Sequence, residues 1–143
     1  MEPRISLVTL GTTDLARAVR FYRDGLGWPM ADIGSGGGEV AFFRTGGAIL
    51  AFYLRHLLAA EAGQSPEGTG FGGIVLAHNV REKEQVDTVL AEAMAAGGTL
   101  LTPARQLEWG GYVGHMADPD GHIWEVCWNP GFPIREDGSV QLP

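Results

Sequence analysis

The feature that most constrains this fold is a turn, Asp-Pro-Asp-Gly at residues 118–121, between two short apolar segments. Residues 111–117 and 122–128 are rich in the β-branched and aromatic residues typical of strands. Pro119 presets φ at the second turn position, and Gly121 accepts a positive φ at the fourth. The sequence therefore predicts an antiparallel hairpin whose type I turn is closed by a glycine bulge.

The turn type decides which residues face each other across this hairpin. With a bulge at Gly121, His115 lies opposite Glu125. A plain two-residue loop puts Gly114 there instead. The bulge is favoured because glycine adopts positive φ at little cost. An imidazole and a carboxylate are thus predicted on one side of a sheet, where a charge among apolar neighbours needs a partner or water.

The same order of elements, one strand, one helix and then three strands, occurs twice along the chain. In the first half these elements are predicted at residues 5–10, 15–26, 28–33, 39–44 and 48–54. In the second half they are predicted at residues 73–79, 86–94, 99–104 and the two strands of the hairpin. Asp14 offers a cap for the first helix. This internal repeat predicts two similar modules.

The two halves overlay without gaps, with residues 42–52 over 116–126 and Leu7 over Gly73. Neither half can cover its sheet alone, so we expect pairing across a pseudo-twofold axis. The predicted fold class is α+β, with two tandem βαβββ modules forming curved mixed sheets around a cleft. Strand alternation predicts that equivalent inward positions are occupied by Leu7, Ala51, Gly73 and Glu125.

The predicted organisation is a single domain over residues 1–143. Module one covers about 4–55, a linker about 56–70, module two about 71–129, and a tail residues 130–143. The start of the connection, residues 55–61, is compatible with a short helix.

Composition excludes several classes of function. The chain has 143 residues, 45% of them hydrophobic, which is enough for a packed core. Its net charge is −7, and no segment concentrates Lys and Arg. Neither nucleic acid nor an anionic membrane is therefore expected as a partner. The single cysteine, Cys127, cannot form an intramolecular disulfide. With no signal peptide or transmembrane run, the sequence predicts a cytoplasmic protein.

Two stretches resemble the vicinal oxygen chelate superfamily, which includes glyoxalases, bleomycin-resistance proteins and extradiol dioxygenases. They are residues 8–22, from Val8 to Tyr22, and residues 118–125, which hold the turn and Glu125. Together with the repeated module, they make the resemblance specific for the fold and much less so for an activity. The likeness spans roughly residues 4–130 by element order.

The resemblance also implies where a metal would bind. Metal-using members of this superfamily place His or Glu ligands at four inward positions. The positions that match here are Leu7, Ala51, Gly73 and Glu125. Three of these side chains cannot donate a lone pair, and one carboxylate does not make a tight transition-metal site. We therefore expect no metal and no other cofactor.

The remaining predicted site residues are aromatic or ionisable. The overlay predicts that Phe43 and Tyr53 form an aromatic wall of the pocket. Trp109, just before the hairpin, either stacks on a flat ligand or covers the core edge. His115 either supports Glu125 structurally or takes part in proton transfer with it.

The sequence favours a metal-free protein that binds an apolar or aromatic small molecule, such as a drug or metabolite, over an enzyme. The alternative is a metal-independent isomerase or lyase in which His115 and Glu125 act as an acid–base pair. A third possibility is a structural module whose cleft is filled by side chains. Open sheet edges and the two-module design also predict a homodimer.

Overall fold

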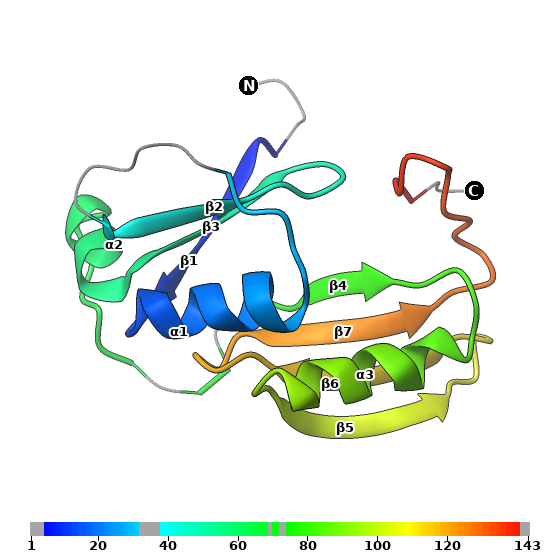
Figure 1. The fold of residues 1–143 in the computed structure, drawn as a ribbon. Helices are drawn as coiled ribbons and strands as arrows, with labels where there is room; N and C mark the ends of the chain where they lie inside the picture. The colour runs from blue at the N-terminus through cyan, green and yellow to red at the C-terminus, as the bar shows by residue number, and fades with distance from the viewer. Residues whose placement is uncertain (1–4, 32–37, 69, 72–73, 141–143) are drawn as a thin grey trace. The chain divides into compact units, whose positions relative to one another are not determined.

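The chain forms two compact units, Met1–Gly72 and Gly73–Pro143. The structure is a computed structural model, and it describes residues 5–31, 38–68, 70–71 and 74–140 (Figure 1). Each unit contains one sheet with helices packed on it, and the two units are described in turn.

The first unit contains a three-stranded sheet in the order β1-β3-β2. Its strands are β1 (Leu7–Thr12), β2 (Val40–Phe43) and β3 (Ile49–Leu54). β1 runs parallel to β3, and β2 runs antiparallel to it. A parallel pair needs a crossover connection, which α1 and the segment after it supply.

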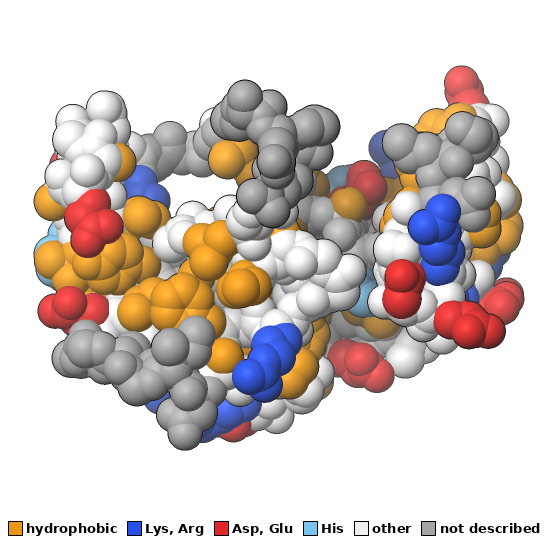
Figure 2. All heavy atoms as spheres, turned by 90° about the horizontal axis from the view of Figure 1, so that it is seen from above, with side chains coloured by type: hydrophobic (Ala, Val, Ile, Leu, Met, Phe, Trp, Pro, Cys, Tyr) orange, Lys and Arg blue, Asp and Glu red, His pale blue; other side chains and the backbone are white. Residues whose placement is uncertain are grey.

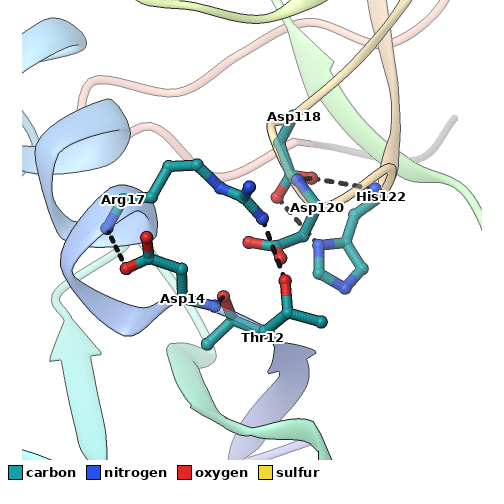
Figure 3. Close-up of polar contacts among 7 residues, drawn as sticks. Thr12, Asp14, Arg17, Asp118, Asp120 and His122 are labelled. Atoms are coloured by element: carbon teal, nitrogen blue, oxygen red, sulfur yellow. Dashed lines mark hydrogen bonds and ion pairs between the residues drawn. The ribbon is translucent and has the colours of Figure 1, made fainter.

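Helix α1 (Leu15–Val19) continues directly into a π-helical segment, η1 (Arg20–Gly25). The predicted cap is confirmed: the Asp14 carboxylate accepts the backbone N–H of Arg17 at 2.9 Å (Figure 3). The N–H of Asp14 in turn donates to the hydroxyl of Thr12 at 3.1 Å. These bonds satisfy amide groups that the first helical turn leaves without a partner.

Aromatic side chains form the core of this unit between α1, η1 and the sheet. The Tyr22 ring is fully buried, and its centroid lies 4.6 Å from that of Phe52 and 5.7 Å from that of Phe43. Phe21 and Trp28 also pack against Tyr22. Aromatic pairs at these separations contribute favourable packing beyond simple burial.

Helix α2 (Arg55–Glu61) begins immediately after β3 and contacts β1 and β3. It lies over Gly11 of β1, where a Cβ atom would approach the Arg55 side chain to 3.2 Å. This contact is tighter than most Cβ contacts, so glycine at position 11 lets α2 lie close to the sheet. The short helix predicted at the start of the connection is confirmed.

The strand predicted at residues 28–33 is much shorter in the structure. Met30 forms an isolated antiparallel bridge with Phe43, and the N–H of Ala31 donates to the Phe42 carbonyl at 2.8 Å. Residues 32–33 lie outside the described residues. Pro29 has no N–H to donate, so a regular ladder cannot run through it.

The second unit contains a four-stranded sheet in the order β4-β7-β6-β5. Its strands are β4 (Leu76–Asn79), β5 (Thr99–Gln106), β6 (Tyr112–Ala117) and β7 (Ile123–Trp128). Helix α3 (Gln85–Ala95) covers one face and contacts β5, β6 and β7 (Figure 1). Its buried residues, Val86, Leu90 and Ala93, have the helical spacing that predicted it.

Two contacts identify the face of this sheet that lies under α3. A Cβ atom at Gly114 would lie 2.6 Å from Cδ1 of Leu90. The hydroxyl of Tyr112 donates to the Asp87 carboxylate of α3 at 3.1 Å. Neighbouring residues of a strand point to opposite faces, so His115, which follows Gly114, faces away from the helix.

The hairpin turn has the predicted bulged form. Gly121 has φ = 87°, and its N–H donates to the Asp118 carbonyl at 3.0 Å. The buried Asp118 carboxylate accepts the N–H of Asp120 and that of His122, both at 2.9 Å, and lies 2.8 Å from Nδ1 of His122 (Figure 3). His115 stands opposite Glu125, so the predicted register is confirmed.

The segment after β7 is attached to the second unit through Arg81. The Arg81 guanidinium donates to the carbonyls of Ile134 and Arg135 at 2.6 and 2.7 Å. Ile134 also forms a bridge with Val140.

The predicted α+β fold class, with one mixed sheet in each half of the chain, is confirmed. Among the described residues, no helix is both long enough and apolar enough to cross a bilayer.

Candidate functional site

A pocket of about 320 Å³ lies on the face of the first sheet opposite α1. Its floor is formed by side chains from all three strands: Thr9, Val40, Phe42, Ala51 and Tyr53. The rest of the wall comes from α2 and from the residue before β2: Leu58, Glu61 and Glu39. All eight residues belong to the first unit.

The floor follows from strand register. Thr9 stands opposite Ala51 and Phe42 pairs with it from the other side, so the three form one row across the sheet. Tyr53 and Val40 form the next row on the same face. Ala51 is 1% exposed, so its neighbours cover almost all of its small side chain where it borders the pocket. Alternation alone therefore places these side chains on one face.

The α2 wall is joined to the floor by a hydrogen bond. The Tyr53 hydroxyl donates to Oε1 of Glu61 at 3.0 Å. This bond, followed by desolvation, raises the pKa of Tyr53, so the phenol remains protonated at neutral pH. A carboxylate has two oxygens and several lone-pair sites, so Glu61 can accept further donors.

The pocket combines apolar walls with acidic groups. Phe42, Val40 and Leu58 present carbon surface, while Glu39 and Glu61 present carboxylates. In Figure 2, hydrophobic side chains gather over this sheet and α2, with both acidic and basic side chains beside them. Within the part of the chain that the structure describes, no Lys or Arg is among the lining residues. The nearby Arg55 donates its Nε–H to the Pro66 carbonyl at 2.6 Å.

A second cluster of polar side chains crosses the face of the second sheet that points away from α3. Nε2 of His115 lies 3.5 Å from Oε2 of Glu125, and both side chains are about one-third exposed. Nδ1 of His115 lies 3.0 Å from the hydroxyl of Thr102 on β5. Hydroxyl, imidazole and carboxylate thus lie in one row across β5, β6 and β7, with both imidazole nitrogens engaged.

Thr102 was not predicted from the sequence. Strand β5 shifts register on both sides of this residue, between Leu100 and Thr102 and again between Thr102 and Arg105. Such irregularities rotate the strand locally. A side chain that simple alternation would place on one face of the sheet then points to the other face. The Thr-Pro pair at positions 102–103 is the one signal for a local departure from regular pairing.

The prediction that Phe43 lines the pocket is wrong. Phe43 is fully buried in the aromatic core under α1, and its neighbour Phe42 lines the pocket instead. The error comes from the ungapped overlay. Phe43 pairs with Leu50 seven positions later, whereas Ala117 pairs with Ile123 six positions later. One extra residue in the first hairpin moves every side chain of β2 to the opposite face.

The other predicted pocket residues have different environments. Ala51 and Tyr53 are among the residues that line the pocket on the first sheet. Leu7 stands opposite Ile49 and is 40% exposed, outside the pocket lining. Trp109 is 55% exposed, and its indole ring lies where a Cβ atom of Gly111 would be. It therefore packs against backbone with one part of the ring and meets solvent with the rest.

Gly73 lies outside the described residues. The residue directly opposite Glu125 on β4 is Ala77, and the residue opposite Ala51 on β1 is Thr9. Two alanines and a threonine offer poor ligands for a divalent cation. Within the described ranges, no group of three or more His, Cys, Asp or Glu side chains is arranged to hold a metal ion. Taken unit by unit, neither facing pair offers a set of ligands that fits a metal, and a metal-free function stays a prediction.

Cys127 follows Glu125 on the same face of β7 but is only 3% exposed. Burial and then the nearby Glu125 charge raise its pKa to about 11. The neutral thiol is the stable form at neutral pH, so the residue lacks the character of a nucleophile.

Comparison with known proteins agrees with this architecture. The model of the Glyoxalase/Bleomycin resistance protein/Dioxygenase superfamily matches residues 4–126. A glyoxalase-related enzyme from Fulvimarina pelagi is 39% identical, with a TM-score of 0.88 and 98% of each chain covered. A lactoylglutathione lyase from Agrobacterium tumefaciens is 24% identical, with a TM-score of 0.67, and the match covers 90% of this chain and 96% of that one; this likeness shows the fold alone.

A curated relative, an uncharacterized protein of Mycobacterium bovis, is 34% identical over 74 residues. That match covers 52% of this chain and 45% of the relative, so it spans less than half of the relative's length. The family match covers most of the sequence, and it confirms the resemblance carried by residues 8–22 and 118–125. The chain therefore belongs to the glyoxalase/bleomycin resistance protein/dioxygenase superfamily.

Proposed function

We propose that this chain is a small-molecule-binding protein whose site is the pocket on the β1-β3-β2 sheet. The observation that carries the proposal is the pocket itself, about 320 Å³ in volume and lined mainly by carbon surface with a few polar groups. Ligand pockets in proteins usually start at about 300 Å³ and have this mixture of walls.

The pocket is built on regular elements, which supports a binding role. Its floor is hydrogen-bonded sheet, and its wall is α2, anchored by the Tyr53–Glu61 bond. Phe42 and Tyr53 offer flat surfaces for an apolar or aromatic ligand. A site on rigid elements loses little conformational entropy when a ligand binds.

Metal-free binding is part of the proposal. It is supported by Leu7 and Ala51, two of the four positions that match the ligand positions of metal-using members, because neither side chain can donate a lone pair to a cation. Elemental analysis of protein purified without chelators tests this part. One divalent ion per chain would overturn the metal-free reading and leave the pocket proposal to be tested on its own.

Filling the pocket floor tests the binding site. Ala51→Leu places a larger side chain in the space above the sheet, so binding of aromatic fragments should be lost. Ala60→Leu makes the same chemical change on the exposed side of α2 and should leave binding intact. Fragment binding is followed by amide chemical shifts of Phe42, Ala51 and Tyr53. Equal binding by both variants would place the site elsewhere.

A second candidate function is metal-independent proton transfer by His115 and Glu125. The 3.5 Å separation of Nε2 and Oε2, with Thr102 on the other imidazole nitrogen, favours it. The test is deuterium incorporation at carbon atoms next to carbonyl groups, followed by NMR for a panel of ketones with EDTA-treated protein. His115→Ala should abolish incorporation, whereas His56→Ala on α2 should not.

A homodimer also belongs to the proposal. Strand β5 is an edge strand, and it exposes Leu100 and Leu101. Unpaired edges of this kind favour association. Light scattering after size exclusion, at several protein concentrations, should give twice the chain mass of 15.3 kDa. A monomer at all concentrations would contradict the dimer without affecting the pocket.

A further inference from the structure

We infer that the ligand of the β1-β3-β2 pocket carries a protonated amine on an apolar or aromatic body. This inference rests on the proposed function and names the class of ligand. It follows from the presence of Glu39 and Glu61 in a cavity whose other lining residues are apolar or carry only a neutral hydroxyl group.

The two carboxylates enter the pocket from different elements. Glu61 is the last residue of α2, and Glu39 immediately precedes β2. Glu39 is held in position by its backbone, since its carbonyl accepts the N–H of Leu54 at 3.2 Å. Two elements that are not neighbours in sequence thus both direct a negative charge to the same cavity of about 320 Å³.

Among the described residues that line the cavity, none is a Lys or an Arg that could neutralise these charges. The guanidinium of Arg55, the first residue of α2, donates its Nε–H to the Pro66 carbonyl at 2.6 Å. The Tyr53 hydroxyl donates to Oε1 of Glu61 and is a neutral donor, so this bond brings no positive charge to the carboxylate. An ammonium group has three N–H donors and no acceptor, so it complements carboxylate oxygens.

The rest of the lining suits the body of such a ligand. Phe42 and Tyr53 present aromatic rings, which attract a cation over the ring face as well as apolar groups. Val40 and Leu58 add aliphatic surface. An anionic ligand of the same shape would meet two like charges, and a neutral one would gain only the apolar contacts. The pocket is therefore expected to select by charge.

A matched series of three fragments tests this selection. The probes are phenethylamine, 2-phenylethanol and 3-phenylpropionate, which have similar aromatic bodies and differ in charge. Each is titrated into labelled protein at neutral pH and low salt, and the amide shifts of Phe42, Ala51 and Tyr53 are followed. We expect the amine to bind at least about tenfold more tightly than the alcohol, a difference of about 1.4 kcal/mol. The propionate should bind most weakly.

Substitution of the carboxylates shows whether they cause the preference. Glu61→Gln keeps an oxygen that can accept the Tyr53 hydroxyl but removes the charge, so the preference for the amine should fall several-fold. Glu39→Gln should act in the same direction, and the double variant should bind amine and alcohol equally. Glu67→Gln, which changes the net charge by the same amount outside the pocket lining, should keep the full preference.

The outcomes separate this inference from the function on which it rests. If all three probes bind at the pocket with similar affinity, the pocket binds small molecules and the inference about charge is wrong. If Glu67→Gln lowers the preference as much as Glu61→Gln, overall charge rather than the pocket causes it, which also overturns the inference. If no probe changes the amide chemical shifts of the pocket residues, both the proposed function and this inference are wrong.

Discussion

His115 and Glu125 face each other across β6 and β7, with Nε2 and Oε2 3.5 Å apart. The pairing depends on the bulge at Gly121, because a shorter turn would put Gly114 opposite Glu125. Glu125 thus has a polar neighbour on an otherwise apolar strand. The third member of the row, Thr102, contacts the opposite nitrogen of the imidazole. The orientation of His115 therefore depends on both neighbouring strands.

Removal of the Thr102 hydroxyl should change the tautomer equilibrium of His115. If Nε2 carries the proton toward Glu125, Nδ1 accepts the Thr102 hydroxyl, and this bond favours that tautomer. Thr102→Val keeps the shape of the side chain but cannot donate. We expect the nitrogen chemical shifts of the His115 ring to move toward a mixture of tautomers in heteronuclear NMR. Thr99→Val, on the same strand, should leave these shifts unchanged, and identical spectra for all three proteins would refute the role of Thr102.

A methyl group at position 114 should destabilise the second unit. Its Cβ would lie 2.6 Å from Cδ1 of Leu90 and 3.0 Å from the backbone nitrogen of Ala104. The backbone atom cannot give way as a flexible side chain can, so Gly114→Ala should cost about 1–3 kcal/mol of unfolding free energy. Urea denaturation of the variant and of the unmodified protein measures this difference in unfolding free energy.

The control for this substitution is Gly47→Ala. A Cβ atom at Gly47 has no neighbour within 4 Å, so the urea concentration at the midpoint of unfolding should hardly change. Equal stability of Gly114→Ala and the unmodified protein would mean that α3 packs less closely on β6 than the structure indicates.

Loss of the Asp118 carboxylate should loosen the turn. This buried group accepts two backbone N–H donors and contacts Nδ1 of His122. Asp118→Ala leaves those donors without their partner, and we expect a loss of about 2–3 kcal/mol. Thermal or urea unfolding provides the measurement. Asp118→Asn keeps one acceptor oxygen and should lose less, so a reversed order of the two variants would contradict this explanation.

The thiol of Cys127 should be almost unreactive in the folded protein. With a pKa raised to about 11, roughly one thiol in a thousand is ionised at pH 8. Iodoacetamide labelling, followed by mass spectrometry, should therefore be slow at pH 8 and accelerate as the pH approaches 11. In urea the ordinary pKa returns and labelling should be fast.

The charge on Glu125 contributes to this shift after burial. Glu125→Gln should therefore lower the Cys127 pKa slightly and raise the labelling rate at pH 9. Glu92→Gln on α3 is the matched control and should leave the rate unchanged. Rapid labelling of the unmodified protein at pH 8 would mean that β7 is more accessible than the structure shows.

The parts of this fold that could be predicted are those set by local chemistry. The Asp14 cap, the apolar spacing of α3 and the Gly121 bulge each depend on a few neighbouring residues. The register of His115 against Glu125 followed from the bulge. Such features are visible in sequence because the physical cause lies within one turn of chain.

The site was harder to predict because its cause is not local. Phe42 replaces Phe43 in the pocket because one hairpin is a residue longer than the other. Thr102 reaches His115 because β5 is irregular on both sides of it. Glu61 joins the pocket only because α2 folds back over Gly11. None of these can be read from residue periodicity, which assumes regular strands.

The direct junction of β3 and α2 has a consequence for how binding can be observed. Leu54 ends the strand and Arg55 begins the helix, so the floor and the wall of the pocket are one uninterrupted length of backbone. The first turn of α2 is therefore tied covalently to the end of β3, with no connecting loop between them. Release of a bound molecule should therefore be coupled to local opening of the sheet. Amide hydrogen exchange in β3 should slow on saturation with ligand as much as that in α2.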